Sequence, residues 1–143
     1  MNNLEIVALC LIFVKIRHIG IAVDSIEKRL PVWESLGLKL DHTEKIDSEG
    51  VTTAHLKVGG YEIELLEPMG KETPVGKFID KKGPGIHHLA LEVDDIEESL
   101  EKAKKNGLEP IGKAPRPGAD NTLIAFFHPK DTGGVLLEIV QSN

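Results

Sequence analysis

Apolar and polar residues alternate along the stretch from Lys15 to Val23, which reads KIRHIGIAV. Alternation with a period of two predicts a β-strand. The large residues at positions 19, 21 and 23 share one side of this strand, and we expect them to face helices in the core. The other side carries His18 beside the small residues at positions 20 and 22. Because small residues leave space unfilled, that side is predicted to be the wall of a cavity.

The rest of the first half predicts one helix and three more strands. The helix opens at Asp24 or Ser25, residue types that cap helix N-termini, and ends at about Leu36 before Gly37, a residue type typical of the position after a helix. An acidic turn at residues 47–50 and the glycine pair at residues 59–60 separate the strands. The predicted strands are Leu38 to Ile46, Val51 to Val58 and Tyr61 to Leu66.

The second half predicts the same order of elements after a connection rich in Pro, Gly and Lys. That connection has room for a short helix around Val75 to Lys81. A loop that contains Pro115 and Pro117 is expected between the second and third strands of this half. The predicted elements are strand Ile86 to Val93, helix Ile96 to Lys105, and strands Leu108 to Gly112, Thr122 to His128 and Val135 to Val140.

The two halves also match residue by residue at a constant offset. His18 pairs with His88, Asp24 with Asp94, and the glycine at 37 with that at 107, each pair being 70 positions apart. A constant offset over some twenty residues indicates an internal repeat. The predicted fold class is therefore α+β, with two tandem βαβββ modules that form one curved mixed sheet around a groove. The modules span residues 15–67 and 85–143, with residues 68–84 as the linker of a single domain.

Composition and charge narrow the classes of function. The chain has 143 residues, of which 41% are hydrophobic and 28% charged, as in a globular protein that stays in solution. A net charge of −6 argues against a nucleic-acid-binding surface. The single cysteine, Cys10, excludes an internal disulfide framework and suits a reducing cytoplasm.

The first fourteen residues lie outside the repeat and contain an apolar run from Leu4 to Val14. This run is shorter than the roughly 20 residues that span a bilayer, and it lacks the basic start and cleavage site of a signal peptide. We therefore expect no membrane role. The run is either an extra edge strand or a stretch ahead of the natural start of translation at Val14 or Lys15. We favour the second interpretation, since the repeat begins immediately afterwards.

Four residues in equivalent places predict a metal site. His18 and His88 open the first strands of the two modules, and Glu64 and Glu138 lie in the last strands. A lone histidine on a strand is more often structural than a ligand, but a carboxylate in an apolar strand needs a partner, and here both types recur in both modules. Two imidazoles and two carboxylates suit a divalent ion such as cobalt, manganese, nickel, zinc or iron.

We expect the remaining histidines to have structural roles. Alternation places His87 on the face opposite His88, and His42, His55 and His128 have no counterpart in the repeat.

The motifs as a whole resemble those of the vicinal oxygen chelate superfamily, which has the glyoxalase/bleomycin resistance fold. Within it the chain is most similar to the methylmalonyl-CoA epimerase family, through KxxGPGIHHLALEVDDI and FxHPKDxGGVLLEI, and the resemblance covers Lys15 to Gln141. It implies a dimer in which each chain has the paired βαβββ fold and binds one divalent ion. Co²⁺ is the expected ion, and Mn²⁺, Ni²⁺ or Zn²⁺ are the alternatives. At the positions of this chain that match the family's motifs, the resemblance implies the metal ligands His18, Glu64, His88 and Glu138.

The same resemblance implies the chemistry. The substrate would be a CoA thioester, methylmalonyl-CoA, whose (R) and (S) forms interconvert when the C2 proton is removed through an enolate and returned. Glu138 is the first candidate for proton transfer. Some family members carry a second glutamate where this chain has Thr53, so Glu49, in the preceding turn, is the candidate for the second group.

Two further activities of the same fold are kept as alternatives. One is a glyoxalase I-like lyase or another vicinal oxygen chelate metalloenzyme, such as a ring-cleaving dioxygenase. The other is a protein that sequesters a ligand without catalysis. A fourth ligand at Glu64 counts against a dioxygenase, which uses two histidines and one carboxylate. A complete ligand set counts against the sequestering protein, which needs no metal.

Overall fold

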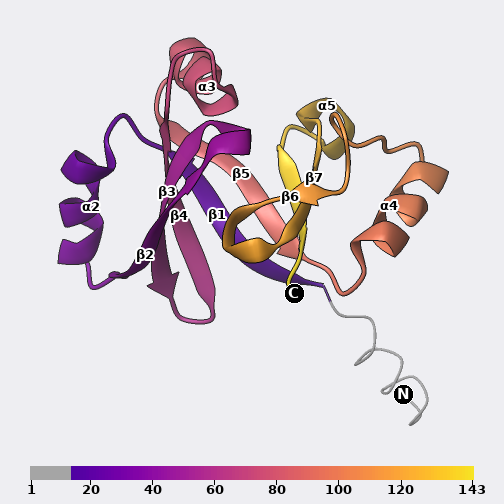
Figure 1. Cartoon of the computed structure of the whole chain (residues 1–143), viewed down its shortest axis with the longest axis horizontal. Helices are drawn as coiled ribbons and strands as arrows, with labels where there is room; N and C mark the ends of the chain where they lie inside the picture. The colour runs from indigo at the N-terminus through magenta and orange to yellow at the C-terminus, as the bar shows by residue number, and fades with distance from the viewer. Residues whose placement is uncertain (1–13) are drawn as a thin grey trace, which may run out of the picture.

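The computed structural model describes residues 14–143, so the predictions about the apolar N-terminal stretch fall almost entirely outside the described residues. Within this part of the chain, eight strands form one mixed sheet in the order β2-β3-β4-β1-β5-β8-β7-β6. Figure 1 shows the sheet curling between two outer helices, with α2 beyond one half and α4 beyond the other. The predicted fold class is confirmed.

The first half has the predicted order of elements. Ser25 caps the first helix, because its hydroxyl accepts a hydrogen bond from the backbone N–H of Lys28 at 3.2 Å. Gly37 follows that helix with φ of 97°, a left-handed conformation that glycine adopts without strain. The elements are β1 (Lys15–Ala22), α2 (Ile26–Ser35), β2 (Lys39–Ile46), a 3₁₀ turn η1 (Asp47–Glu49), β3 (Val51–Val58) and β4 (Tyr61–Pro68).

The second half repeats this order after the connecting helix α3 (Pro74–Lys82). The first and last strands pair in parallel in each half, β1 with β4 and β5 with β8. The elements are β5 (Gly85–Glu92), α4 (Ile96–Lys105), β6 (Arg116–Pro117), a 3₁₀ turn η2 (Ala119–Asn121), β7 (Leu123–Phe127), α5 (Pro129–Thr132) and β8 (Leu137–Gln141).

One predicted strand is wrong. No strand forms over residues 108–112, where Pro110 makes only an isolated bridge with Phe127. The edge strand β6 instead consists of Arg116 and Pro117, inside the segment predicted as a loop. Proline lacks the N–H that a β-ladder needs, so a segment with prolines at 110, 115 and 117 pairs only over short stretches at the sheet edge.

The outer face of each half of the sheet is covered by its own helix. In the first half, Val23, Leu56 and Leu65 are buried, and Trp33 of α2 packs against them. In the second half, Ile96 of α4 is fully buried with Phe127 and its neighbours. Because the helices fill the outer face, the inner face of the curved sheet is left to line a cavity.

The two halves meet at the antiparallel pair β1 and β5. In this pair His18 lies opposite Ala90 and Gly20 opposite His88. On the flanking strands, Gly20 also lies opposite Glu64 and Ala90 opposite Glu138. The four predicted ligands therefore enter from the four central strands at neighbouring positions.

Candidate metal centre

All five residues predicted for the site line one cavity of about 740 Å³ on the inner face of the sheet. His18, Glu64, His88 and Glu138 are buried, each with no more than 6% of its surface exposed. The fifth residue, Glu49, comes from η1 rather than from a strand. Buried ionisable groups need a counter-charge or a hydrogen bond, so their contacts decide what the site can hold.

Three of these side chains converge on one point. Nε2 of His18 lies 2.8 Å from Nε2 of His88, and Oε1 of Glu138 lies 3.1 Å from the former and 3.4 Å from the latter. Despite these distances, Oε1 of Glu138 forms no hydrogen bond of acceptable geometry. Within residues 14–143 it is the one buried side-chain nitrogen or oxygen atom without a hydrogen-bond partner. A polar atom buried without a partner is unfavourable. Two imidazole nitrogens and this oxygen form a donor set that fits a divalent cation.

The electrostatics of this cluster favour positive charge at its centre. Burial raises the pKa of Glu138, but contacts with the two histidines outweigh burial and lower the pKa to about 2. Burial lowers the pKa of His18, but the contact with Glu138 and the charges of Glu64 and Glu138 raise it above its ordinary value. Because a cation binds an imidazole nitrogen only when that nitrogen carries no proton, metal binding at His18 is expected to compete with protons.

Glu64 lies in the same cavity but faces a different atom. Its Oε2 is 3.4 Å from Nδ1 of His18 and 3.8 Å from Nδ1 of His55. The carboxylate thus contacts the nitrogen of His18 that points away from His88. A carboxylate in this position orients a metal-binding imidazole and fixes its tautomer.

His87 is not where strand alternation predicted it. The β1–β5 pairing shifts register between Gly20 and Ile21, so β5 has a bulge at His87. A bulge interrupts the alternation of sides and re-aims a side chain. His87 lines the cavity, and its Nδ1 lies 2.9 Å from Nδ1 of His88. Burial and the nearby His88 lower the pKa of His87 to about 4, so the His87 ring is neutral near pH 7 and its Nδ1 can accept a hydrogen bond from the Nδ1–H of His88.

Glu49 is held at the cavity wall by the other half of the chain. The guanidinium of Arg116 donates a hydrogen bond of 2.7 Å to its Oε1. Arg116 also lies over the ring of Phe126, at 5.4 Å. The pairing fixes one oxygen of Glu49 and leaves the carboxylate beside the cavity.

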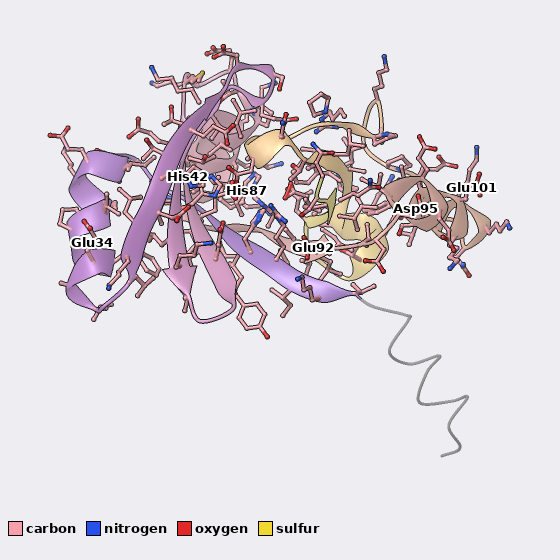
Figure 2. The ribbon with its side chains drawn as sticks, turned by 60° about the horizontal axis from the view of Figure 1, so that its bottom comes forward. Glu34, His42, His87, Glu92, Asp95 and Glu101 are labelled. Carbon is pink, nitrogen blue, oxygen red and sulfur yellow. The ribbon has the colours of Figure 1, made fainter. Side chains whose placement is uncertain are left out.

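A second polar cluster, which sequence reasoning missed, joins the two halves beside the cavity, and two of its residues, His55 and Asp120, line the cavity. Nε2 of His42 lies 2.7 Å from Asp120, and the backbone N–H of Asp120 donates to Glu44 at 3.0 Å. The ring of His42 stacks on that of His55 at 4.1 Å. Hydrogen bonds with Asp41 and Asp120 raise the pKa of His42. No repeat pattern could reveal this cluster, because its residues have no counterparts 70 positions away. In Figure 2, His42 and His87 lie between the two outer helices, which carry Glu34 and Glu101.

Across residues 14–143, none of the helices combines the length and the hydrophobicity that crossing a membrane requires.

Comparisons with known proteins agree with the observed fold. A model of the glyoxalase/bleomycin resistance protein/dioxygenase superfamily matches residues 17–126. The structure of a hypothetical protein from Bacillus halodurans C-125 is similar with a TM-score of 0.88 and 46% identity, covering 91% of this chain and 95% of that one. The mitochondrial methylmalonyl-CoA epimerase of Homo sapiens is 32% identical over 90% of this chain and 74% of its own length. The structure of a methylmalonyl-CoA epimerase in complex with methylmalonyl-CoA and NH4⁺ is similar with a TM-score of 0.86 and 34% identity, covering 90% of this chain and 94% of that one.

Proposed function

Because the chain belongs to the glyoxalase/bleomycin resistance protein/dioxygenase superfamily, we propose that it is a metal-dependent isomerase that interconverts (R)- and (S)-methylmalonyl-CoA. The observation that carries the proposal is the convergence of His18, His88 and the unpartnered oxygen of Glu138 inside a large cavity. Similarity to methylmalonyl-CoA epimerases over most of the chain supports the choice of substrate.

In this proposal, His18, His88 and Glu138 hold the ion, and Glu64 either orients His18 or turns to become the fourth ligand. Cobalt is the first choice of metal, with manganese, nickel or zinc as alternatives, because the donors are nitrogen and oxygen without thiolate. A divalent ion held there would supply Lewis-acid stabilisation of the negative charge that develops on the thioester oxygen when the C2 proton leaves to form an enolate.

Epimerisation needs proton exchange on both faces of C2. We assign one face to Glu138, whose buried carboxylate lies at the centre of the cluster, and the other to Glu49. The position of Glu49 on the cavity wall supports this second role, and its hydrogen bond from Arg116 would keep the carboxylate correctly placed. Thr53 lacks a group that can take up a proton at neutral pH.

We place the enzyme in the cytoplasm and propose that it forms a homodimer. The single cysteine fits a reducing compartment. The sheet has an open edge at β2, eight residues long, which a second chain could cover.

The proposal is tested by giving the metal-loaded protein one epimer of methylmalonyl-CoA and, separately, the methylglyoxal–glutathione adduct. We expect the first substrate to epimerise and the second to stay unchanged. Activity should disappear on chelation, and His18→Ala and His88→Ala should be folded but nearly inactive. Conversion of only the glutathione adduct would assign the protein to the glyoxalase I-like alternative.

The two glutamates of the last strands should respond differently to substitution. Glu138→Gln removes a group that accepts a proton, so turnover should fall by about 10²–10⁴-fold even with metal bound. Glu64→Gln removes one negative charge, so metal affinity should fall. Because the amide keeps an oxygen in the same place, turnover at saturating metal should largely survive. The measurement is solvent deuterium exchange into C2 of methylmalonyl-CoA, with metal content determined for each variant. Equal exchange rates in the two variants would show that the proton carrier is a residue other than Glu138.

A further inference from the structure

Three lysines of α3 form a positive rim at the entrance to the cavity. Lys77, Lys81 and Lys82 all line it and are exposed to solvent. Within residues 14–143 none of the three has an ion pair with a carboxylate, whereas Lys57 pairs with Glu62 at 3.2 Å. Figure 1 shows α3 above the ends of β4 and β5, beside the space between the two halves. The lysine rim, as we call these three residues, therefore carries positive charge that no carboxylate of the described chain neutralises.

The ordinary explanation for lysines on a helix covers only part of this rim. Lys81 and Lys82 lie in the last turn of α3, where positive charge interacts favourably with the helix dipole. Lys77 lies in the first half of the same helix, where the dipole opposes a positive charge. The helix dipole therefore does not account for a positive charge at Lys77.

The rim contrasts with the carboxylates that also line the cavity, of which Glu64 and Glu138 are buried, and with the chain as a whole, which carries a net charge of −6. Arg17 and Arg116 line the same cavity, but each is paired with a carboxylate, Arg17 with Glu92 and Arg116 with Glu49. An anionic ligand would be repelled by the carboxylates unless unpaired positive charge met it at the entrance. The acidic residues that line the cavity are Glu49, Glu62, Glu64, Asp120 and Glu138.

Side-chain contacts lead directly from the rim to the metal centre. The ammonium of Lys82 lies 5.8 Å from the ring centre of Phe78, and that ring lies 4.9 Å from the ring of His87. His87 in turn contacts His88 at 2.9 Å. A ligand anchored at the metal could therefore follow this wall of the cavity to the lysines.

The size of the cavity limits how much of such a ligand it encloses. A volume of about 740 Å³ suits a drug-sized molecule, which is smaller than a whole CoA thioester. The acyl group and part of the pantetheine arm would fill the cavity, and the nucleotide would remain at the entrance.

We propose that the lysine rim binds the phosphates at the nucleotide end of a CoA thioester whose acyl group lies at the metal centre. This inference rests on the proposed function, because it takes the substrate to be a CoA thioester. Lysine binds phosphate as a compact positive charge, and several lysines on one helix suit a nucleotide with more than one phosphate.

The test compares two substrates that share the methylmalonyl group, methylmalonyl-CoA and methylmalonyl-pantetheine, of which the second lacks the nucleotide. In the double variant Lys77→Ala/Lys81→Ala, kcat/KM for the CoA substrate should fall about tenfold or more relative to the pantetheine substrate, through KM rather than kcat. Tenfold is the loss expected when a charge-assisted hydrogen bond is removed. The matched control is Lys104→Ala/Lys105→Ala, which removes two exposed lysines of α4 that do not line the cavity. An equal change for both substrates in the α3 variant would overturn the proposal.

A binding experiment separates this proposal from the proposed function. Adenosine 3′,5′-bisphosphate, which carries phosphates of the nucleotide end without any acyl group, should bind the wild-type protein in calorimetry. Its affinity should fall about tenfold in the α3 variant and stay unchanged in the α4 control. Loss of binding only in the α3 variant would support the lysine rim even if neither thioester were epimerised. Equal binding to all three proteins, or none to the wild type, would overturn it even if methylmalonyl-CoA were the substrate.

Discussion

Gly20 occupies a position on β1 where the imidazole of His88 takes up the space of a side chain. A Cβ at Gly20 would lie 2.2 Å from Cε1 and 2.5 Å from Nδ1 of His88. No pair of such atoms approaches this closely, so the ring would have to move. The small residue in the first strand is therefore required by the buried histidine of the strand beside it.

Gly20→Ala should displace a proposed metal ligand and leave the fold in place. We expect metal affinity to fall by about 10- to 100-fold, as when residues that orient a ligand are lost, with a stability cost of about 1–3 kcal/mol from overpacking. Metal titration calorimetry and urea unfolding measure the two effects. Gly60→Ala is the control, because open space surrounds Gly60. Unchanged metal affinity in Gly20→Ala would show that His88 is not a ligand.

Glu62 should make stability depend on pH in the acid range. Its contact with His55, and a weaker one with Lys57, lower its pKa from 4.5 to about 2, although partial burial acts in the opposite direction. The carboxylate stabilises the fold fully above its unfolded pKa, and this contribution is lost as the pH falls through about 2.

Glu62→Gln should therefore cost about 1 kcal/mol at neutral pH, a value reduced for solvent screening. The difference from wild type should shrink between pH 4.5 and about 2. Urea unfolding across this range measures it. Glu101→Gln, on the exposed side of α4, should change stability little at any pH. A constant difference between Glu62→Gln and wild type would contradict the assignment.

At the scale of elements, the corresponding helices of the two halves are capped in the same way. Ser25 caps α2, and Asp95 caps α4 by accepting a hydrogen bond from the backbone N–H of Glu98 at 3.1 Å. The repeat in sequence is thus a repeat of local structure, since each cap follows the strand that carries a buried histidine.

Asp95→Ala should remove the cap of α4 and lower the free energy of unfolding by about 1 kcal/mol. Asp95→Ser, which can accept the same hydrogen bond, should lose much less. The neighbouring Asp94→Ala is a control, because Asp94 forms no cap at this helix. Urea unfolding midpoints compare the three variants, and an equal loss in Asp94→Ala and Asp95→Ala would contradict the role of the cap.

The strands depart from regular alternation at equivalent places. Register shifts occur between Ile16 and His18 and between Gly20 and Ile21, which places bulges at Arg17 and His87, 70 positions apart. Both bulged residues line the cavity. The duplicated unit therefore includes the irregularity that turns an extra side chain toward the site.

The whole molecule brings two halves together along β1 and β5 and leaves β2 and β6 at the edges of the sheet. Several large apolar residues are also exposed on the described surface, among them Leu36, Tyr61 and Ile86. Exposed sheet edges and apolar residues favour association with a second chain.

We accordingly predict a dimer in solution at micromolar concentration. Light scattering should give twice the mass of the 15.6 kDa chain, with or without metal. A monomeric mass under the same conditions would contradict the prediction and leave the edge of β2 without a covering chain.

Sequence by itself determined the order of elements and the equivalence of the two halves. Hydrophobic periodicity and turn residues act over a few positions, and the 70-residue offset identified His18 with His88. The one misplaced strand lies where prolines prevent regular pairing, so local pattern says little there.

Only the tertiary structure decided which side chains contact each other between the two halves of the chain. Glu49 pairs with Arg116, 67 positions away, and Asp120 meets His42 across 78 positions. The contact of Glu64 with Nδ1 of His18, and the turn of His87 toward the cavity, depend on register and on a bulge. Such contacts are set by how strands align in space, and no local pattern of apolar and polar residues records that alignment.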